Sequence, residues 1–503
     1  MNEFTVNSMT NDAMGDCDAT ALAKRIADKE VSPTEVLEAA ITRAELVNPK
    51  LNAIVTESLD LSLEQARENA KKHSNNSLLK TGAFAGVPTF VKDNTDVKGL
   101  PTLFGSNAVA KRPAKQNGEF TDQMLSTGLT ILGKTTLPEF GIMPTTESVA
   151  QGATRNPWNI NHSSGGSSGG AAALVAAGVV PIAHGNDGGG SIRIPAAACG
   201  LVGLKPTRNR LVNMHGTEIL PINVGHEGVI TRSVRDTALF MAEAEKHFSN
   251  SKLPTLGHVQ APGKKRLRIG LITGALKGIT VQPDIQRTQN ETGLLCESLG
   301  HSVEEVAFPF EDQIADDFLI YYSMLFFSMH RFGKFVVGPG FDSSKVEKLC
   351  AHLSNSFVGN LGKFPFSLMR LKNAIKITQE MHKHYDVLLC PTLATTAPKI
   401  NYISNQALPA SAMVRNMTEF APFAALQNIT GEPAISLPMG TGDNGLPIGM
   451  QFSAGYGEDK TLLELAYELE EAKAWKHIHE QVAKKPTKKT ARKTTKKPIA
   501  EKS

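Results

Sequence analysis

The sequence is poor in the features that mark disulfide-bonded, metal-binding and membrane-spanning proteins. Its five cysteines are odd in number, widely spaced and free of any C-x-x-C pair, which argues against a disulfide framework or a structural zinc site. It has no H-E-x-x-H motif, and we expect no metal and no cofactor. Its best apolar run, residues 171–180, ends at Pro181, well short of the roughly 20 residues of a membrane helix. The first residues lack a signal-peptide pattern, so we expect a cytoplasmic protein without a membrane partner.

Basic charge is concentrated at one end of the chain. The net charge of +4 hides this asymmetry, because residues 482–503 carry nine Lys or Arg and one Glu. Without them, the 53 basic and 49 acidic residues of the chain become 44 and 48. The segment has no apolar periodicity, so we expect a disordered Lys-rich tail. Two roles stay open for it: a solvated tail without a partner, or weak contact with nucleic acid.

Strand and helix patterns alternate along the chain. Short apolar or β-branched runs predict strands at residues 87–91, 130–132, 179–183, 267–272, 303–307, 387–389, 434–437 and 448–452. Helical patterns, the first of which includes the capping box of Ser32 and Glu35, cover parts of residues 20–47, 62–72, 171–178, 283–299 and 459–474. This alternation predicts an α/β protein with a mixed sheet. Because we find no repeat and no clear linker, we divide the chain into a loose segment 1–19, a single domain 20–481 and the tail 482–503.

Two clusters of glycine and serine carry the strongest functional signal. They are Gly165–Gly170 and Gly188–Ser191, which place Ser167 and Ser191 24 residues apart. Lys92 precedes Ser167 by 75 residues, at the end of a predicted apolar strand. Glycine-rich backbone approaches a ligand closely and leaves its N–H groups unobstructed.

These residue types suit acyl transfer without histidine. A serine hydroxyl needs a base to take its proton as it attacks a carbonyl, and lysine can serve where burial keeps its amine neutral. The apolar residues before Lys92 favour such burial. The successive N–H groups of Gly188, Gly189, Gly190 and Ser191 are candidate donors for the oxyanion that forms during the attack. The chain therefore contains candidates for a nucleophile, a base and an oxyanion hole.

A histidine-based triad is the competing interpretation. His162 and His184 stand shortly before the two clusters. With fourteen histidines in the chain, such proximity is unsurprising, and no aspartate pattern singles out either residue. A triad is recognised by its geometry and not by the order of its residues in the sequence. The positions of these histidines therefore do not support a triad, and we favour lysine as the base.

The sequence resembles the amidase signature family of serine hydrolases over residues 20–475. The two clusters and the upstream lysine match the family in type and spacing. Further matching motifs are Thr154–Trp158, Pro195–Ala197, Gly203–Thr207, Gly431–Pro438 and Gly445–Gln451. The resemblance implies the amidase signature fold, in which helices flank both faces of a mixed central β-sheet.

The resemblance also implies roles for the clustered residues. Ser191 corresponds to the acylated nucleophile and Lys92 to the terminal base. Ser167, which follows a cis peptide bond in the family, corresponds to the proton relay between them.

The resemblance also implies that three neighbouring residues support the catalytic residues structurally. Ser168 would bond to nearby backbone or to the lysine. Asp187 and Arg193 would brace the oxyanion loop, although two such charges taken alone suggest an ordinary surface ion pair.

The predicted function is hydrolysis of a carboxylic amide of the non-peptide or cyclic kind. The segment Gly185–Ser191, with Asn186 and Gly188 at its variable positions, is similar to that of cyclic-dimer 6-aminohexanoate hydrolases and related bacterial amidases. Two alternatives stay open: the glutaminase subunit of a tRNA-dependent amidotransferase, and an inactive binding protein that contacts nucleic acid through its basic tail. As partners we expect a small-molecule amide and a second copy of the chain in a homodimer.

Two segments are candidates for the wall of the substrate pocket. Residues 318–332 are unusually rich in aromatic residues and methionine, and residues 413–423 are the second candidate. For residues 318–332, packing into a helical core is the other interpretation, and both stay open.

Overall fold

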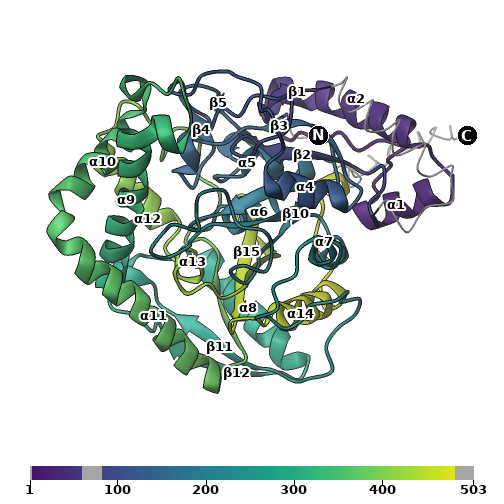
Figure 1. Cartoon of the computed structure of the whole chain (residues 1–503). Helices are drawn as coiled ribbons and strands as arrows, with labels where there is room; N and C mark the ends of the chain where they lie inside the picture. The colour runs from purple at the N-terminus through teal and green to yellow at the C-terminus, as the bar shows by residue number, and fades with distance from the viewer. Residues whose placement is uncertain (1–2, 59–81, 482–503) are drawn as a thin grey trace, which may run out of the picture.

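The computed structural model describes residues 3–58 and 82–481 and is built around an eight-stranded mixed sheet (Figure 1). In spatial order its strands are β12 (Ser302–Ala307), β11 (Arg268–Thr273), β13 (Val387–Pro391), β15 (Pro447–Ala454), β14 (Ala434–Thr441), β9 (Val202–Lys205), β10 (His226–Thr231) and β8 (Ile182–Asp187). Strand β11 is parallel to β12 and β13, and the remaining neighbours are antiparallel. The predicted α/β class with a mixed sheet is therefore confirmed.

Smaller sheets lie beside the large one. One has three strands, in the order β1 (Ile54–Glu57), β3 (Thr130–Thr135) and β2 (Pro88–Lys92). The short pairs are β4 (Glu147–Ser148) with β5 (Gly152–Ala153) and β6 (Arg155–Asn156) with β7 (Asn159–Ser163). Strand β2 also touches β8 of the large sheet, since the Thr89 hydroxyl donates to the carbonyl of Ile182 at 2.9 Å. This contact lies near the starts of the two strands, and further along Lys92 N–H donates to His184 Nδ1 at 3.1 Å, so the ends of β2 and β8 also lie close together.

Helices surround the sheets in the part of the chain that the structure describes. They are α1 (Ala19–Ala27), α2 (Pro33–Leu51), α4 (Glu119–Ser126), α5 (Gly169–Ala176), α6 (Arg193–Cys199), α7 (Val234–His247), α8 (Pro283–Ser298), α9 (Gln313–Val336), α10 (Lys348–Gly359), α11 (Phe364–His384), α12 (Ala410–Phe420), α13 (Leu426–Thr430) and α14 (Asp459–Ala472). None of these helices is long and apolar enough to cross a membrane.

Helices cover both faces of the large sheet. Successive residues of a strand point to opposite sides, so the contacts of neighbouring residues show which helix covers which face. In β15, Gln451 accepts a hydrogen bond from Arg193 of α6 at 2.7 Å. A Cβ at Gly449, on the same side of β15, would lie 2.5 Å from the Cβ of Ala197 in α6. Gly440 of β14 pairs with Ile448, which points to the other side, and a Cβ at Gly440 would lie 2.6 Å from Thr288 of α8. Helices α6 and α8 therefore lie on opposite faces.

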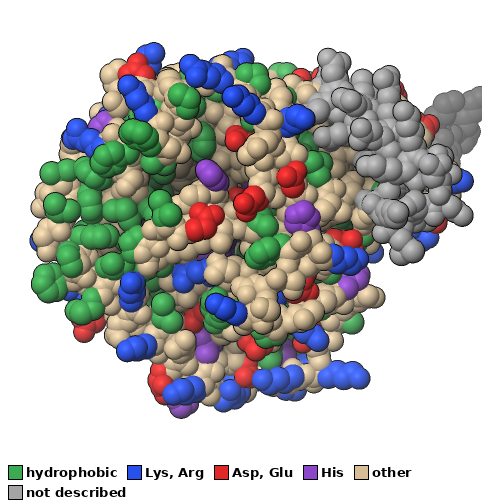
Figure 2. All heavy atoms as spheres, viewed as in Figure 1, with side chains coloured by type: hydrophobic (Ala, Val, Ile, Leu, Met, Phe, Trp, Pro, Cys, Tyr) green, Lys and Arg blue, Asp and Glu red, His purple; other side chains and the backbone are tan. Residues whose placement is uncertain are grey.

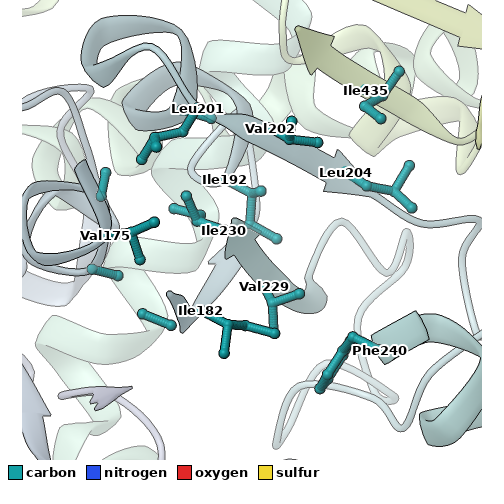
Figure 3. Packing of buried hydrophobic residues seen from close by; sticks show 14 of the residues in the cluster. Val175, Ile182, Ile192, Leu201, Val202, Leu204, Val229, Ile230, Phe240 and Ile435 are labelled. Atoms are coloured by element: carbon teal, nitrogen blue, oxygen red, sulfur yellow. The ribbon is translucent and has the colours of Figure 1, made fainter. Parts of the chain in front are cut away.

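The apolar core fills the space between the sheet and the helices around the two glycine clusters. Figure 3 shows Val175 of α5, Ile182 of β8 and Ile230 of β10 together with Ile192, which follows the second cluster. All four side chains are fully buried. Both clusters are thus anchored on rigid core elements.

Most elements lie where the sequence predicts them, and the capping box of Ser32 and Glu35 starts α2. One strand is displaced. The prediction at residues 179–183 is wrong in register, because β8 begins at Ile182 and extends to Asp187, where it pairs with β10 along its whole length. The helix predicted at residues 62–72 and the tail 482–503 lie outside the described residues.

The expectation of a loose N-terminal segment is wrong for residues 4–18. Val6 N–H donates to the carbonyl of Pro157 and Ser8 N–H to that of Ala177, both at 2.8 Å. Asp12 also forms an ion pair with the buried Arg43 at 2.6 Å. The segment is therefore fixed by partners remote in sequence, which its polar composition does not reveal.

Candidate active site

The two glycine and serine clusters lie next to each other at the starts of two helices. The first cluster leads into α5, whose N-cap is Ser168, and the second joins β8 to α6. Ser168 connects the clusters, because its N–H donates to the carbonyl of Ser191 and its hydroxyl to the carbonyl of Asn186, each at 3.3 Å. These contacts place Ser168 between the loops as a structural link.

Lys92 is the last residue of β2 and its side chain is fully buried beside the first cluster. Its Nζ lies 2.7 Å from Ser167 Oγ. The same atom lies 2.7 Å from Asn186 Oδ1 and 3.5 Å from the Asn186 carbonyl oxygen. Burial lowers the pKa of Lys92 from 10.5 to about 7, against the opposing effect of Glu227 and Asp187. Around and above neutral pH, a large fraction of the amine is therefore unprotonated.

Asn186 is a neighbour of the lysine that the sequence identified only as a variable position. Its amide nitrogen donates to Asn94 Oδ1 at 3.0 Å, which turns its oxygen toward Lys92. Asn94 follows Lys92 by two positions, but nothing in its sequence context indicated this contact. The sequence signal for Asn186 was its departure from the threonine that is common in the family.

Ser167 and Ser191 occupy the space between the buried lysine and a cavity. The peptide bond from Gly166 to Ser167 is cis, as the family resemblance implies. Ser167 is buried, whereas Ser191 is half-buried and lines the cavity. Among the described residues, no hydrogen bond joins the two serine hydroxyls. Hydrogen bonds that serve catalysis are often long until substrate binds.

One of the four expected oxyanion donors is already engaged. Gly190 N–H donates to Asp187 Oδ1 at 2.6 Å, so the expectation that it stabilises an oxyanion is corrected. Within residues 3–58 and 82–481, the N–H groups of Gly188, Gly189 and Ser191 have no protein acceptor. Gly189 and Ser191 both border the cavity. Three donors therefore remain available, and the fourth fixes the shape of the loop.

Asp187 and Arg193 form a buried, bidentate ion pair. Arg193 Nε donates to Asp187 Oδ2 and Arg193 Nη2 to Oδ1, both at 2.9 Å, and both side chains are fully buried. The surface ion pair is therefore the wrong interpretation. Burial alone would raise the pKa of Asp187, but the Arg193 charge holds the pKa of this carboxyl well below its usual range.

Further amides complete the surroundings of this pair. Arg193 donates to Gln451 at 2.7 Å and to Asn428 Oδ1 at 2.7 Å, and Asn428 Nδ2 donates back to Asp187 Oδ1 at 2.9 Å. Two of these side chains lie within or next to motifs that match the family. Sequence reasoning did not connect them to the site, because it cannot show which face of β15 or α13 meets Arg193.

The two histidines do not serve as a base in this arrangement. His184 Nδ1 accepts the Lys92 backbone N–H at 3.1 Å, and its Nε2 lies 2.8 Å from Glu227 Oε2. Both ring nitrogens are thus occupied. In the described part of the chain, neither His162 nor His184 bonds to the hydroxyl of Ser167 or Ser191. The histidine-based interpretation therefore has no geometric support.

The cavity beside Ser191 has a volume of about 140 Å³ and is lined by uncharged residues. Its wall consists of Gly141, Ile142, Met143, Pro144, Gly189, Ser191, Ile194, Leu276, Phe308, Phe310, Ile314, Ala315, Phe318, Leu319, Tyr322, Val414, Met417, Thr418, Ala421, Pro422, Ala425, Leu426 and Ile429. The polar side chains in this wall are the hydroxyls of Ser191, Tyr322 and Thr418. The cavity is therefore suited to an uncharged and largely apolar ligand.

Both segments predicted for the pocket contribute to it. From residues 318–332, Phe318 and Tyr322 line the cavity, while Tyr321 and Phe326 of the same helix are buried in apolar clusters. One side of α9 therefore forms part of the pocket wall, and another side packs into the apolar core, so each of the two interpretations is correct for part of the segment. From residues 413–423, the cavity is lined by Val414, Met417, Thr418, Ala421 and Pro422. The sequence did not indicate residues 141–144, which also line it.

A serine hydrolase that uses lysine in place of histidine accounts for this arrangement. The family model for amidases matches residues 35–463. The chain is 44% identical over 474 residues to the Mycobacterium leprae protein named "Putative amidase AmiC", covering 94% of this chain and 98% of the relative. It is 34% identical over 491 residues to the 6-aminohexanoate-cyclic-dimer hydrolase of Paenarthrobacter ureafaciens, covering 91% and 95%.

Solved structures agree with these relatives. A 6-aminohexanoate cyclic dimer hydrolase complexed with substrate matches with a TM-score of 0.81 and 29% identity, over 94% of this chain and 98% of that chain. A bacterial aryl acylamidase of the amidase signature family matches with a TM-score of 0.81 and 27% identity, over 94% and 99%. The chain belongs to the amidase family, with the amidase signature fold, and is an amidohydrolase that acts on small-molecule amides.

Proposed function

We propose that Ser191 is the acylated nucleophile, Ser167 the proton relay and Lys92 the base. The observation that carries this proposal is the 2.7 Å contact of Lys92 Nζ with Ser167 Oγ, in a pocket where the pKa of the lysine falls to about 7. Ser191 stands on the cavity side of Ser167. A neutral amine takes a proton from Ser167, and Ser167 takes one from Ser191 as its oxygen attacks the amide carbonyl.

Asn186 fixes the direction of the Lys92 lone pair. A neutral amine has two N–H donors and one lone pair, and Lys92 has three oxygen neighbours. The two oxygens of Asn186 can only accept hydrogen bonds, so both N–H groups point to them. The lone pair is then left for the hydroxyl hydrogen of Ser167. Asn186 is in this way a positioning residue for the base.

The N–H groups of Gly188, Gly189 and Ser191 are the proposed oxyanion donors. The carbonyl oxygen becomes negatively charged when Ser191 attacks, and fixed backbone donors stabilise that charge. The Asp187–Arg193 pair holds the loop by engaging Gly190. The proton then returns through Ser167 to the nitrogen of the leaving amine, the C–N bond breaks, and water hydrolyses the ester of Ser191 by the same relay.

The substrate that the cavity supports best is an uncharged amide with an apolar group next to the carbonyl. In the part of the chain that the structure describes, the cavity wall has no charged side chain, and its polar side-chain groups are three hydroxyls. Two relatives are named for a cyclic dimer of 6-aminohexanoate and for aryl acylamides. Both names describe amides without a required charge, in agreement with this cavity.

The same cavity argues against the glutaminase alternative. Free glutamine carries an ammonium and a carboxylate next to each other, and burial of either charge without a partner is costly. None of the described residues that line the cavity supplies such a partner. The alternative of an inactive binding protein is disfavoured by the intact contacts of Lys92 and Ser167. The role of the basic tail in nucleic-acid contact stays a prediction.

A substrate comparison tests this proposal. We expect kcat/KM for hexanamide and benzamide to exceed that for L-glutamine by at least about 10³-fold, because a site that leaves charges unpaired rejects them by such factors. The Ser191→Ala variant provides the blank for each substrate. Equal or better turnover of glutamine would overturn the proposed substrate class, and full activity of the variant would overturn the role of Ser191.

A further inference from the structure

Large apolar side chains are exposed together on one side of the molecule. The described residues have thirteen exposed large hydrophobic side chains. Seven of them form what we call the apolar face: Phe332, Phe335, Val336, Val358, Leu361, Phe366 and Met369. They come from the end of α9, the end of α10, the turn after α10 and the start of α11. In Figure 2 hydrophobic side chains gather on the side of the molecule where Figure 1 places these helices.

The apolar face rests on a packed aromatic layer. The ring centroids of Phe327 and Phe357 are 5.2 Å apart, and those of Phe357 and Phe364 are 5.3 Å apart. Phe335, eight positions after Phe327 on α9, is 91% exposed. Core packing therefore explains the inner side of these helices and not their outer side. Contiguous exposed apolar patches usually mark a contact with a protein or a membrane.

Basic residues accompany the apolar face. Residues 330–376 contain eight Lys or Arg and two acidic residues. Lys334 stands beside Phe335 on α9, and Lys372 and Lys376 follow Met369 at helical spacing on α11. All three lysines are exposed, and none forms an ion pair with another described residue. An apolar surface with basic neighbours complements an anionic lipid surface, where each such charge adds to binding.

Helix α9 connects the apolar face to the cavity. Phe318 and Tyr322 in its first half line the cavity. Phe332 and Phe335 near its end belong to the apolar face. An uncharged apolar amide that fits the cavity would also concentrate in a lipid surface. A lipid that receives the apolar face would thus bring the enzyme to such compounds.

We propose that the apolar face docks on an anionic lipid surface, with Phe335 and Phe366 inserted at the level of the headgroups. A second copy of the chain is the less suitable occupant, because a two-fold contact through this face would bring the same lysines together. The proposal does not depend on the catalytic roles of the serines. It revises the expectation of no membrane partner, which rested on the length of apolar runs and did not address surface docking.

Tryptophan fluorescence tests the proposal in the full-length protein. We introduce Phe335→Trp on the apolar face and, as a matched control, Leu46→Trp on α2 at the other end of the molecule, where Leu46 is 61% exposed. The natural Trp158 and Trp475 are both 7% exposed and give a constant background. The probes are vesicles of phosphatidylcholine with and without phosphatidylglycerol. We expect a blue shift of the Phe335→Trp emission with the anionic vesicles and none for Leu46→Trp.

A second variant separates this contact from attraction through the basic tail, which is present in every sample. We expect Phe335→Asp with Phe366→Asp to weaken vesicle binding by about tenfold or more, since burial of one Phe side chain alone accounts for such a factor. Activity on water-soluble hexanamide stays unchanged, because neither residue lines the cavity. An unshifted Phe335→Trp emission on bound vesicles would overturn the proposal. A dimer in sedimentation that the double variant dissociates would overturn it in favour of a second copy.

Discussion

At the scale of single residues, the amine of Lys92, the proposed base, should determine how activity depends on pH. Its pKa is lowered by burial to about 7, and only the unprotonated form accepts a proton from Ser167. We therefore predict that kcat/KM is constant above neutral pH and falls about tenfold per unit below pH 7. The measurement is a pH profile of hexanamide hydrolysis. A profile that stays flat down to pH 5 would contradict the assignment of Lys92 as the base.

Substitution of the lysine gives the matching residue-level test. Lys92→Met should lower kcat by about 10²–10⁴-fold, the usual contribution of a general base. Lys98, an exposed lysine six positions later, provides the control, and Lys98→Met should retain full activity. Circular dichroism of both variants checks that the fold is intact.

A negative charge introduced at position 186 should shift the pH dependence of activity. Asn186→Asp places a carboxylate where Asn186 Oδ1 now lies 2.7 Å from the amine, and an opposite charge at this distance raises the pKa of a lysine by about 1–3 units. The acid limb should therefore move to higher pH by that amount. Asn186→Ala should lower kcat on the plateau without moving the limb upward. An unchanged limb in Asn186→Asp would show that Asn186 does not act through Lys92.

At the scale of elements, the loop between β8 and α6 depends on two glycines in different ways. Gly190 has a φ of +122°, and a Cβ there would lie 2.6 Å from the Cβ of Ala424. A Cβ at Gly188 would meet no atom within 4 Å. We predict that Gly190→Ala lowers the free energy of unfolding by about 1–3 kcal/mol and removes most activity. Gly188→Ala should stay within about 0.5 kcal/mol of the parent.

Urea unfolding and hexanamide kinetics measure this pair of variants. Because both substitutions add one methyl group to the same loop, their difference isolates the backbone conformation and the contact with Ala424. Equal stability and activity of the two variants would contradict the loop geometry described for Gly190.

The elements themselves were largely predictable from the sequence, because periodicity and capping are local. The capping box at Ser32 and the apolar runs of β11 and β13 act within a few residues. The bounds of β8 were not predictable from local patterns, because its pairing with β10 extends the strand into the polar residues Asn186 and Asp187. Polar strand residues of this kind are fixed by partners across the sheet, which a local pattern does not contain.

At the scale of the whole molecule, the sequence indicated the proposed reacting groups better than their surroundings. Lys92, Ser167 and Ser191 belong to local motifs at the ends of elements, so their spacing was informative. The engagement of Gly190 by Asp187 needed the three-dimensional turn. The contact of Asn186 with Asn94 spans 92 positions. The cavity wall combines segments from residue 141 to residue 429, and only the folded chain shows which of their side chains meet.

The central claim, that Ser191 forms an acyl-enzyme through Ser167 and Lys92, is tested most directly by trapping the intermediate. The enzyme is mixed with p-nitrophenyl hexanoate, quenched in acid within its first turnovers and digested for mass spectrometry. We predict a hexanoyl group on the peptide of Ser191, none in Ser191→Ala, and much slower labelling in Lys92→Met. A hexanoyl group on any other residue of the wild-type enzyme, or its persistence at full rate in Ser191→Ala, would contradict the claim.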